Sequence, residues 1–118
     1  MIKAMENPHV DVVAHPTGRL LGQRESYSVN VERLVEAARR TGTVLEINAG
    51  PQRLDLRDTQ ARMAQERGVK LAINTDAHTR YQLRYMEFGV GTARRGWVEK
   101  KNVINTLPLN DLRAFLRR

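Results

Sequence analysis

Apolar residues recur along the chain with two alternating periods, and the alternation predicts strands separated by helices. Short apolar runs rich in β-branched residues occupy residues 10–14, 43–48 and 69–74, and they have the length of buried strands. Between these runs, apolar positions recur at the three- and four-residue spacing of one helix face. This βαβ repeat predicts parallel strands joined by right-handed crossovers.

Cap residues indicate where two of the helices begin and end. Asn30 precedes the first periodic segment and suits an N-cap, and Gly42 follows that segment and suits a left-handed C-terminal residue. Asp58 and Gly68 bound a second helix in the same way, over roughly residues 58–67. Local sequence signals therefore define the expected boundaries of both helices.

The pattern changes after His78. Residues 80–88 have helical periodicity, and glycines are expected to interrupt the segment that follows at positions 89, 91 and 96. Residues 103–104 predict a short final strand. Asn110 is a candidate cap for a last helix, whose buried side would hold Leu112, Phe115 and Leu116.

The chain has 118 residues, which limits how much of a barrel it can form. A closed barrel of eight strands and eight helices needs roughly 250 residues. We therefore expect an α/β fold whose parallel βα repeats form part of a larger barrel or sheet. Three such strands would leave an exposed edge on each side, which favours pairing with a second copy of the chain, a homodimer.

The amino-acid composition gives the chain a positive net charge and excludes several classes of protein. The formal net charge is +7, and arginine supplies sixteen of the twenty basic residues. Arginine pairs bidentately with phosphate, so nucleic acid is an expected partner, although a genome biased toward arginine codons explains the same composition. The absence of cysteine excludes disulfides and thiolate metal sites. No apolar run reaches the ~18 residues of a membrane span, so we expect no membrane partner and a cytoplasmic location.

Three candidate metal ligands directly follow predicted strands. His15 follows the first strand, and Asp76 and His78 follow the third at a spacing that puts both side chains on one side of an extended segment. The carboxyl ends of parallel strands lie together, and three ligands hold one divalent ion while leaving positions for water and substrate. The alternatives are a packing histidine at position 15 and a helix-capping aspartate followed by a surface histidine.

Further polar residues lie near the same predicted edge. Asn48 ends the second strand, where it would bind a phosphate or a metal-bound water. Glu46 lies deeper, and we expect a structural carboxylate paired with a basic neighbour, with a general base as the alternative. Arg19 follows a glycine turn and would either clamp a substrate phosphate or form an ordinary salt bridge. Arg53 and Asp55 are expected to brace loops.

Several other functions lack their sequence signals. There is no glycine-rich phosphate loop, no serine nucleophile elbow and no His-Glu-x-x-His motif, which disfavours kinases, α/β-hydrolases and zincin proteases. His9 lies at the wrong end of its strand for catalysis. Aromatic residues are few, so we expect Tyr81, Tyr85 and Trp97 to pack in the core or in loops and not to stack on bases.

In this order, the motifs resemble those of the PHP (polymerase and histidinol phosphatase) domain, most closely the version at the C-terminus of bacterial family X DNA polymerases. The motifs that carry the resemblance lie at residues 10–21, 45–49, 53–56, 74–78 and 88–97. The last of them contains Gly-Thr-Ala-Arg-Arg-Gly-Trp, which favours the polymerase branch over the histidinol phosphatases.

The resemblance implies a distorted, TIM-like barrel of parallel strands that holds divalent ions, usually Mn²⁺ or Zn²⁺. It implies phosphoester hydrolysis, in this branch a 3′–5′ exonuclease or related processing of DNA 3′ ends in repair. His15 matches the histidine of the His-Pro motif, and Asp76 and His78 match the final Asp-x-His pair. Arg19 and Asn48 would then hold DNA phosphates. Histidine and aspartate alone suit zinc, manganese and iron alike.

The sequence departs from the family's pattern in its first half. The initial His-x-His motif is absent, as are a glutamate and further histidines expected with it. Residues 1–118 therefore resemble the C-terminal portion of a single PHP domain, without its N-terminal half and without polymerase domains, and we expect the remainder of the domain as a partner. On its own, the chain should bind metal weakly and hydrolyse DNA little. The alternatives are a non-catalytic DNA-binding or scaffold fragment and a phosphomonoesterase of the histidinol phosphatase type.

Overall fold

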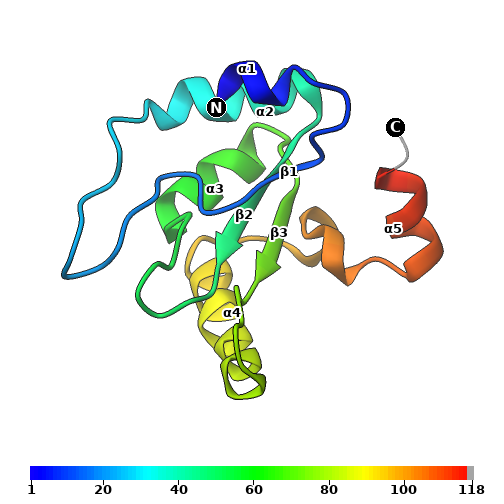
Figure 1. The fold of residues 1–118 in the computed structure, drawn as a ribbon. Coiled ribbons are helices and arrows are strands. Elements are labelled where there is room, and N and C mark those ends of the chain that lie inside the picture. Colours follow the sequence, from blue (N-terminus) through cyan, green and yellow to red (C-terminus); the bar gives the residue numbers. More distant parts are fainter. Residues whose placement is uncertain (117–118) are drawn as a thin grey trace.

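Three parallel strands run through the centre of the molecule, and helices lie around them (Figure 1). A computed structural model describes residues 1–116. The strands are β1 (Val12–Val13), β2 (Val44–Asn48) and β3 (Leu71–Asn74), in the order β1-β2-β3. Both neighbouring pairs are parallel, which confirms the α/β class and the predicted βαβ repeat.

Five α-helices and three 3₁₀ helices accompany the sheet in the described residues. The α-helices are α1 (Ile2–Met5), α2 (Val31–Thr41), α3 (Asp58–Glu66), α4 (Met86–Arg95) and α5 (Leu109–Leu116). The 3₁₀ helices are η1 (Arg80–Tyr85), η2 (Lys100–Asn102) and η3 (Ile104–Thr106). Asn30 caps α2 by accepting the backbone N–H of Arg33, and Gly42 ends it in the left-handed region, as predicted. Asp58 is the first residue of α3 and not its cap, which is Arg57.

The central strand β2 is buried on both faces, and its residues alternate between two environments. Leu45 and Ile47 join the main core, together with Leu71 and Ile73 of β3 and the apolar faces of α2 and α3. Val44 lies on the opposite face, in a smaller cluster with Ala72, Ile104, Leu112 and Phe115. The polar side chains of Glu46 and Asn48 lie on that second face.

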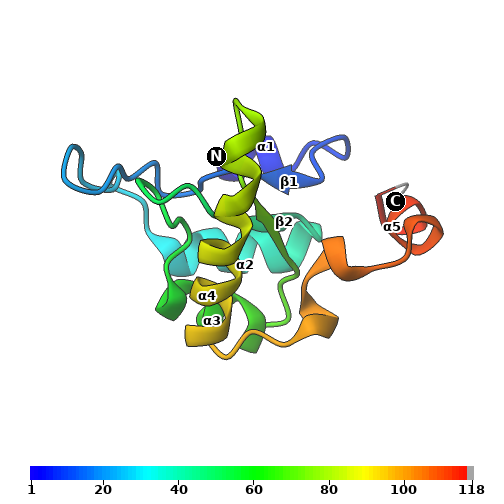
Figure 2. The ribbon, with the colours of Figure 1, turned by 90° about the horizontal axis from the view of Figure 1, so that it is seen from below.

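Helix α4 passes close to the end of the sheet, and Gly89 allows the approach (Figures 1 and 2). A Cβ atom at Gly89 would lie 2.6 Å from Ile73 Cγ2 and 2.7 Å from Ala49 Cβ. The expectation that Gly89 and Gly91 would interrupt the chain here was wrong, because α4 continues through both. The glycine at position 89 serves close packing between helix and sheet, which outweighs its low helix propensity.

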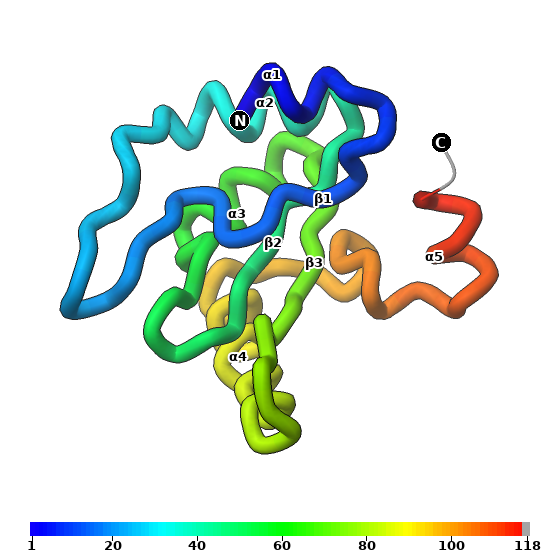
Figure 3. The backbone as a smooth tube through the Cα atoms, in the orientation of Figure 1, coloured from blue at the N-terminus to red at the C-terminus, as the bar shows by residue number. Residues whose placement is uncertain are grey.

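The first strand is shorter and more exposed than predicted. Only two residues of the run 10–14 form β1, and Val12 is 37% exposed, so the expectation of a buried strand was wrong. From Ala14 to Asn30 the chain runs as an extended loop at one side of the sheet (Figure 3).

The C-terminal part also differs from the prediction. Val103 makes a single parallel bridge with Leu71 and not a strand, and Asn110 lies inside α5 and not at its cap. The side chain of Asn105 accepts from Ile73 N at 3.1 Å and donates to Ile73 O, so it takes the place of a neighbouring strand. The outer edge of β3 is therefore covered and not exposed as expected. Leu112 and Phe115 face the core from α5 as predicted, whereas Leu116 is 36% exposed.

No helix within residues 1–116 combines the length and the apolar character required to cross a membrane.

Candidate active site at the carboxyl ends of the strands

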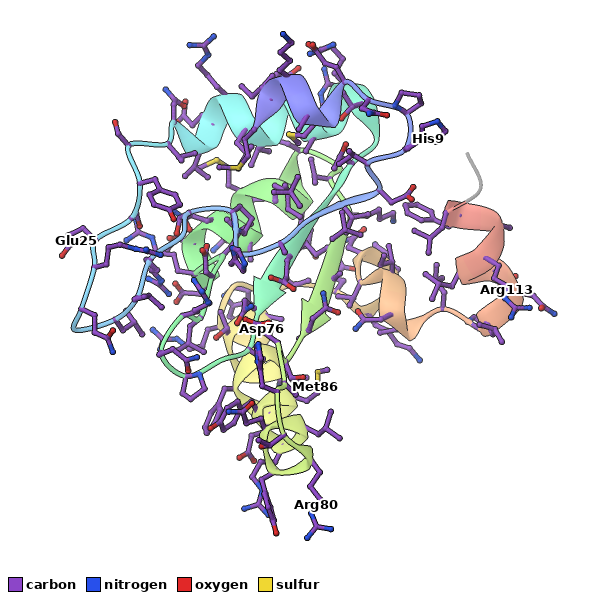
Figure 4. All side chains as sticks on the ribbon, viewed as in Figure 1. His9, Glu25, Asp76, Arg80, Met86 and Arg113 are labelled. Carbon is purple, nitrogen blue, oxygen red and sulfur yellow. The ribbon has the colours of Figure 1, made fainter. Side chains whose placement is uncertain are left out.

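The candidate ligands follow β1 and β3 at the end of the sheet where both strands have their carboxyl termini. His15 lies two residues after β1, and Asp76 lies two residues after β3 and just beyond the strand ends (Figure 4). Both residues have left-handed backbone conformations, with φ of 32° at His15 and 52° at Asp76. His15 and Asp76 are both exposed, so their side chains are open to solvent. Asp76 does not cap the following helix, because Thr79 occupies the cap of η1.

The imidazole ring of His78 is held by a hydrogen bond to the backbone just before it. Its Nδ1 atom lies 2.7 Å from the carbonyl oxygen of Asp76, so Nδ1 carries the proton that it donates. Its backbone N–H donates to Gln82 Oε1 at 2.6 Å. In the neutral ring, this bond at Nδ1 leaves the lone pair on Nε2, and Nε2 is one of the two ring nitrogens through which an imidazole binds a metal.

Glu46 joins the ends of all three strands. Its Oε2 atom accepts the backbone N–H of His15 at 2.6 Å, and its Oε1 atom accepts from Asn74 Nδ2 at 2.9 Å. The amide of Asn48 donates to Oε2 at 3.3 Å. Glu46 is 4% exposed, and these partners are amides and not the basic side chain that we expected. It is the positioning residue of this end of the sheet.

Asn48 is fully buried, away from the surface where a phosphate would approach. Its Oδ1 atom accepts from Gly50 N at 3.0 Å, while its Nδ2 atom bonds Glu46. Both ends of the amide are therefore engaged within the protein. In this arrangement Asn48 fixes the loop after β2.

Asp55 braces the loop that contains His15, as expected. One carboxylate oxygen accepts the backbone N–H groups of Thr17 at 3.0 Å and Gly18 at 2.9 Å. Asp55 is 0% exposed, and burial raises the pKa of its carboxyl group, partly offset by the hydrogen bonds from Thr17 and Gly18. Because burial is the largest effect, this carboxylate costs more to ionise than an ordinary aspartate.

Arg19 lies apart from the three candidate ligands. Its Nε atom donates to the carbonyl of Arg53 at 2.7 Å, and its Nη2 atom donates to the carbonyl of Leu54. Burial lowers the pKa of its guanidinium group. Arg19 lines a cavity of about 200 Å³ together with Arg57 and Arg95, and none of the candidate ligands lines that cavity.

Arg53 also lies at the candidate site. From the sequence, we expected its side chain only to brace loops. Its Nε atom lies 3.8 Å from Asp76 Oδ2, and its side chain is 19% exposed. Its Nη1 atom is buried and has no hydrogen-bond partner in the described residues. A guanidinium group beside a candidate ligand holds positive charge where a phosphate would arrive. The sequence feature that could have indicated this role is the position of Arg53 in the loop after β2.

Two aromatic residues are exposed and not packed as expected. Tyr81 is 64% exposed and Trp97 is 74% exposed, whereas Tyr85 is half-buried and lies 6.0 Å from the ring of Phe88. The expectation that Tyr81 and Trp97 pack in the core or loops was wrong. Tyr81 belongs to η1, which projects from the end of the sheet, and Arg80 marks its tip in Figure 4.

The candidate ligands have the chemistry of a divalent-metal site but do not form a closed cluster. Two imidazoles and a carboxylate suit zinc, manganese or iron. Within residues 1–116, no three side chains of histidine, cysteine, aspartate or glutamate converge closely enough to hold an ion. The donor set fits a metal because His78 is already held in the ligating tautomer, and His15 lies on the neighbouring loop.

Comparison with known proteins identifies related sequences. The chain is 53% identical over 115 residues to the DNA polymerase/3′-5′ exonuclease PolX of Bacillus subtilis (strain 168), and the match covers 98% of the chain. The chain is homologous to a segment of a family X DNA polymerase. The resemblance recognised in the sequence is therefore confirmed, although no protein-family model matches the chain.

Two further relatives of the chain are named as phosphatases. A probable phosphatase of Thermoanaerobacter sp. (strain X514) is 27% identical over 90% of the chain. A probable phosphatase of Caldanaerobacter subterraneus subsp. tengcongensis is 33% identical over 66% of the chain. The chain spans 20% of the length of PolX, and 43% and 31% of the lengths of these two phosphatases. These matches support a phosphoesterase relationship, and they give no support to a second copy of the chain as partner.

Proposed function

We propose that the chain is the C-terminal portion of the PHP-type phosphoesterase domain of a family X DNA polymerase. In this proposal the complete domain hydrolyses phosphodiester bonds at DNA 3′ ends during cytoplasmic DNA repair. The observation that carries the proposal is the 53% identity to PolX across 98% of the chain. The positions of His15, Asp76 and His78 at the carboxyl ends of parallel strands support it.

The residues of this chain divide into ligands and groups that orient them. We assign His15, Asp76 and His78 as ligands of Mn²⁺ or Zn²⁺, with Asp76 and His78 also nearest the reacting phosphate. A bound divalent ion would supply charge that neutralises phosphoryl oxygens and acidifies a water molecule. Glu46 holds the His15 backbone and the Asn74 side chain, and the Asp76 carbonyl holds the His78 ring.

Phosphate binding is assigned to cationic and amide groups near these ligands. Arg19 and Asn48 were the expected phosphate-binding residues. In the structure, Arg53 lies nearer to Asp76, and Asn48 is buried. We therefore assign Arg53 to the phosphate at the reacting end of the DNA strand and Arg19 to phosphates further along that DNA strand. Asn48 supports the loop after β2.

Metal content of the purified chain is the first test. We expect about one weakly bound ion per chain by elemental analysis and titration, because three ligands hold one ion and the three in this chain do not converge into a closed cluster in the described residues. The double variant Asp76→Ala/His78→Ala should lose it. His9→Ala is the matched control, since His9 is exposed and lies away from Asp76 (Figure 4). Equal metal content in all three proteins would contradict the assigned ligands.

A phosphomonoesterase is the second candidate, favoured by the relatives that are named probable phosphatases. The complete domain would then remove a phosphate from a small molecule or a DNA end and leave phosphodiesters intact. Assays on a 3′-recessed duplex and on a phosphomonoester, each with metal added, separate the two. Hydrolysis of the monoester alone would replace the exonuclease assignment.

A further inference from the structure

We propose that a groove lined by arginines, beside the candidate active site, binds the backbone of single-stranded DNA. The arginine groove is defined by Arg19, Arg24, Tyr27, Arg57 and Arg95. It consists of three cavities of about 200, 450 and 300 Å³, each of which is lined by both Arg19 and Arg57. The inference deepens the proposed function, because it names the form of DNA that approaches the site.

The charge of the arginine groove favours a polyanion. Four guanidinium groups line it, against the carboxylates of Glu25 and Asp58. Asp58 pairs with Arg95 at 3.2 Å, but the Arg95 side chain is 79% exposed, so this ion pair contributes little. The groove therefore keeps an excess of positive charge on a chain that is basic as a whole.

Two of the arginines are already held in place. Arg19 donates to the carbonyls of Arg53 and Leu54, and Arg24 donates to the carbonyl of Gly18 at 3.1 Å from Nε and 2.6 Å from Nη2. Because these side chains are fixed before a ligand arrives, less conformational entropy is lost for each phosphate contact that their remaining N–H groups make.

An exposed ring in the groove favours a single strand over other polyanions. Tyr27 is 53% exposed, and the guanidinium of Arg24 lies 5.1 Å from its ring centroid. Gly18 lies in close contact with the ring, since a Cβ atom there would be 2.0 Å from Tyr27 Cε2. Rings and guanidinium planes provide surfaces on which unpaired bases stack, whereas bases within a duplex are already stacked.

The arginine groove is connected to the strand ends through one short loop. Arg19 binds the backbone of residues 53–54, and the Arg53 side chain lies 3.8 Å from Asp76. The loop that carries Arg24 and Tyr27 extends to the side of β1, where Glu25 marks it in Figure 4. A DNA strand held in the arginine groove would thus lie beside the loop of residues 53–54, which faces the candidate ligands.

The test is binding of a fluorescent dT20 oligonucleotide to the chain in EDTA, followed by anisotropy at several salt concentrations. The double variant Arg57→Gln/Arg95→Gln removes two exposed cations from the groove. We expect about tenfold weaker binding and a log–log salt slope smaller by about 1.4, the value for two phosphate contacts on a single strand. The control Arg67→Gln/Arg113→Gln removes the same charge elsewhere and should retain the wild-type affinity; Figure 4 shows Arg113 on α5, across the molecule from Glu25.

The variant Tyr27→Leu tests the base-stacking part of the inference. It keeps an apolar side chain on Gly18 and removes the ring, so dT20 binding should weaken several-fold while inorganic polyphosphate, which has no bases, competes as before. Urea unfolding verifies that each variant folds. Equal losses in the groove variant and the control would overturn the inference, as would displacement of dT20 by polyphosphate at an equal concentration of phosphate groups.

The metal site does not enter this measurement, so the two proposals fail separately. The wild-type chain serves for both measurements, because dT20 binding is measured in EDTA and metal binding is measured without DNA. A wild-type chain that binds no metal, while dT20 binding falls selectively in Arg57→Gln/Arg95→Gln, would contradict the proposed metal site alone. Intact metal binding without selective loss in Arg57→Gln/Arg95→Gln would contradict the groove alone.

Discussion

Left-handed backbone conformations mark the loops that surround the candidate active site. Of the non-glycine residues with positive φ, His15 follows β1, Leu54 follows β2 and Asp76 follows β3. Such conformations cost of order 1–3 kcal/mol each and persist where surrounding contacts hold them. For His15 the contact is Glu46, and for Leu54 it is Arg19, which donates to its carbonyl. All three left-handed residues therefore lie in loops at the carboxyl ends of the strands.

Removal of the negative charge at Glu46 should loosen this end of the sheet. In Glu46→Gln, one amide N–H group would face either His15 N–H or Asn74 Nδ2, and one buried hydrogen bond would be lost. We expect the free energy of unfolding to fall by about 1–3 kcal/mol. Metal affinity should fall about tenfold, as for other groups that orient ligands. Urea unfolding and metal titration measure the two effects, with exposed Glu36→Gln as control.

Asp55 should give the chain a distinctive dependence of stability on pH. Burial raises its pKa above the ordinary 3.8, so the folded state holds this proton more tightly than the unfolded state. The stabilising contribution of the protonated carboxyl is present below the unfolded pKa and is lost as pH rises through the folded pKa. The stability difference, wild type minus Asp55→Asn, should therefore decrease as pH increases from about 4. A difference that stays constant or increases would exclude a raised pKa.

At the scale of elements, the packing of α4 on the sheet depends on a missing side chain. Gly89→Ala would place Cβ within 2.7 Å of both Ile73 and Ala49, so we expect a loss of about 1–3 kcal/mol from overpacking. Gly91→Ala is the matched control in the same helix, because nothing lies within 4 Å of its Cβ position. That variant should gain about 0.5–1 kcal/mol from helix propensity. Equal effects in urea unfolding would contradict the close contact at Gly89.

The elements that the sequence predicted well are those whose signals are local. The strands β2 and β3 and the helices α2 and α3 follow from apolar periodicity and caps, as the bond between Asn30 and the Arg33 N–H shows. The parallel direction of the strands also follows from the βαβ repeat. Local patterning was sufficient there because each apolar face is buried by the next element along the chain.

The predictions that failed depended on contacts between distant residues. Gly89 is helical because of Ile73 and Ala49, and the outer edge of β3 is covered because Asn105 bonds Ile73. At the site, the positions after the strands indicated His15 and Asp76. The hydrogen-bond partners of Glu46 could not be read from a sequence, since they come from the loop after β1, from β2 and from β3.

At the scale of the whole molecule, the strand ends and the arginine groove form two regions with different chemistry. The strand ends combine imidazole and carboxylate groups, while the groove combines guanidinium groups with an exposed tyrosine. The loop of residues 53–55 connects them, because Arg53 faces Asp76 and Asp55 holds Thr17 and Gly18. This division fits our two proposals, in which the arginine groove holds a DNA strand and the residues at the ends of the β-strands act on the end of that DNA.

The described part of the chain does not gather three metal ligands into one cluster, and this limits the activity expected of it. With added Mn²⁺, turnover of a 3′-recessed duplex by the chain alone should therefore match that of its Asp76→Ala variant. Binding of dT20 should nevertheless persist, because the groove lies within residues 19–95. Gel analysis of the labelled duplex measures the turnover. Robust hydrolysis that Asp76→Ala abolishes would show that these ligands form a competent site without further residues.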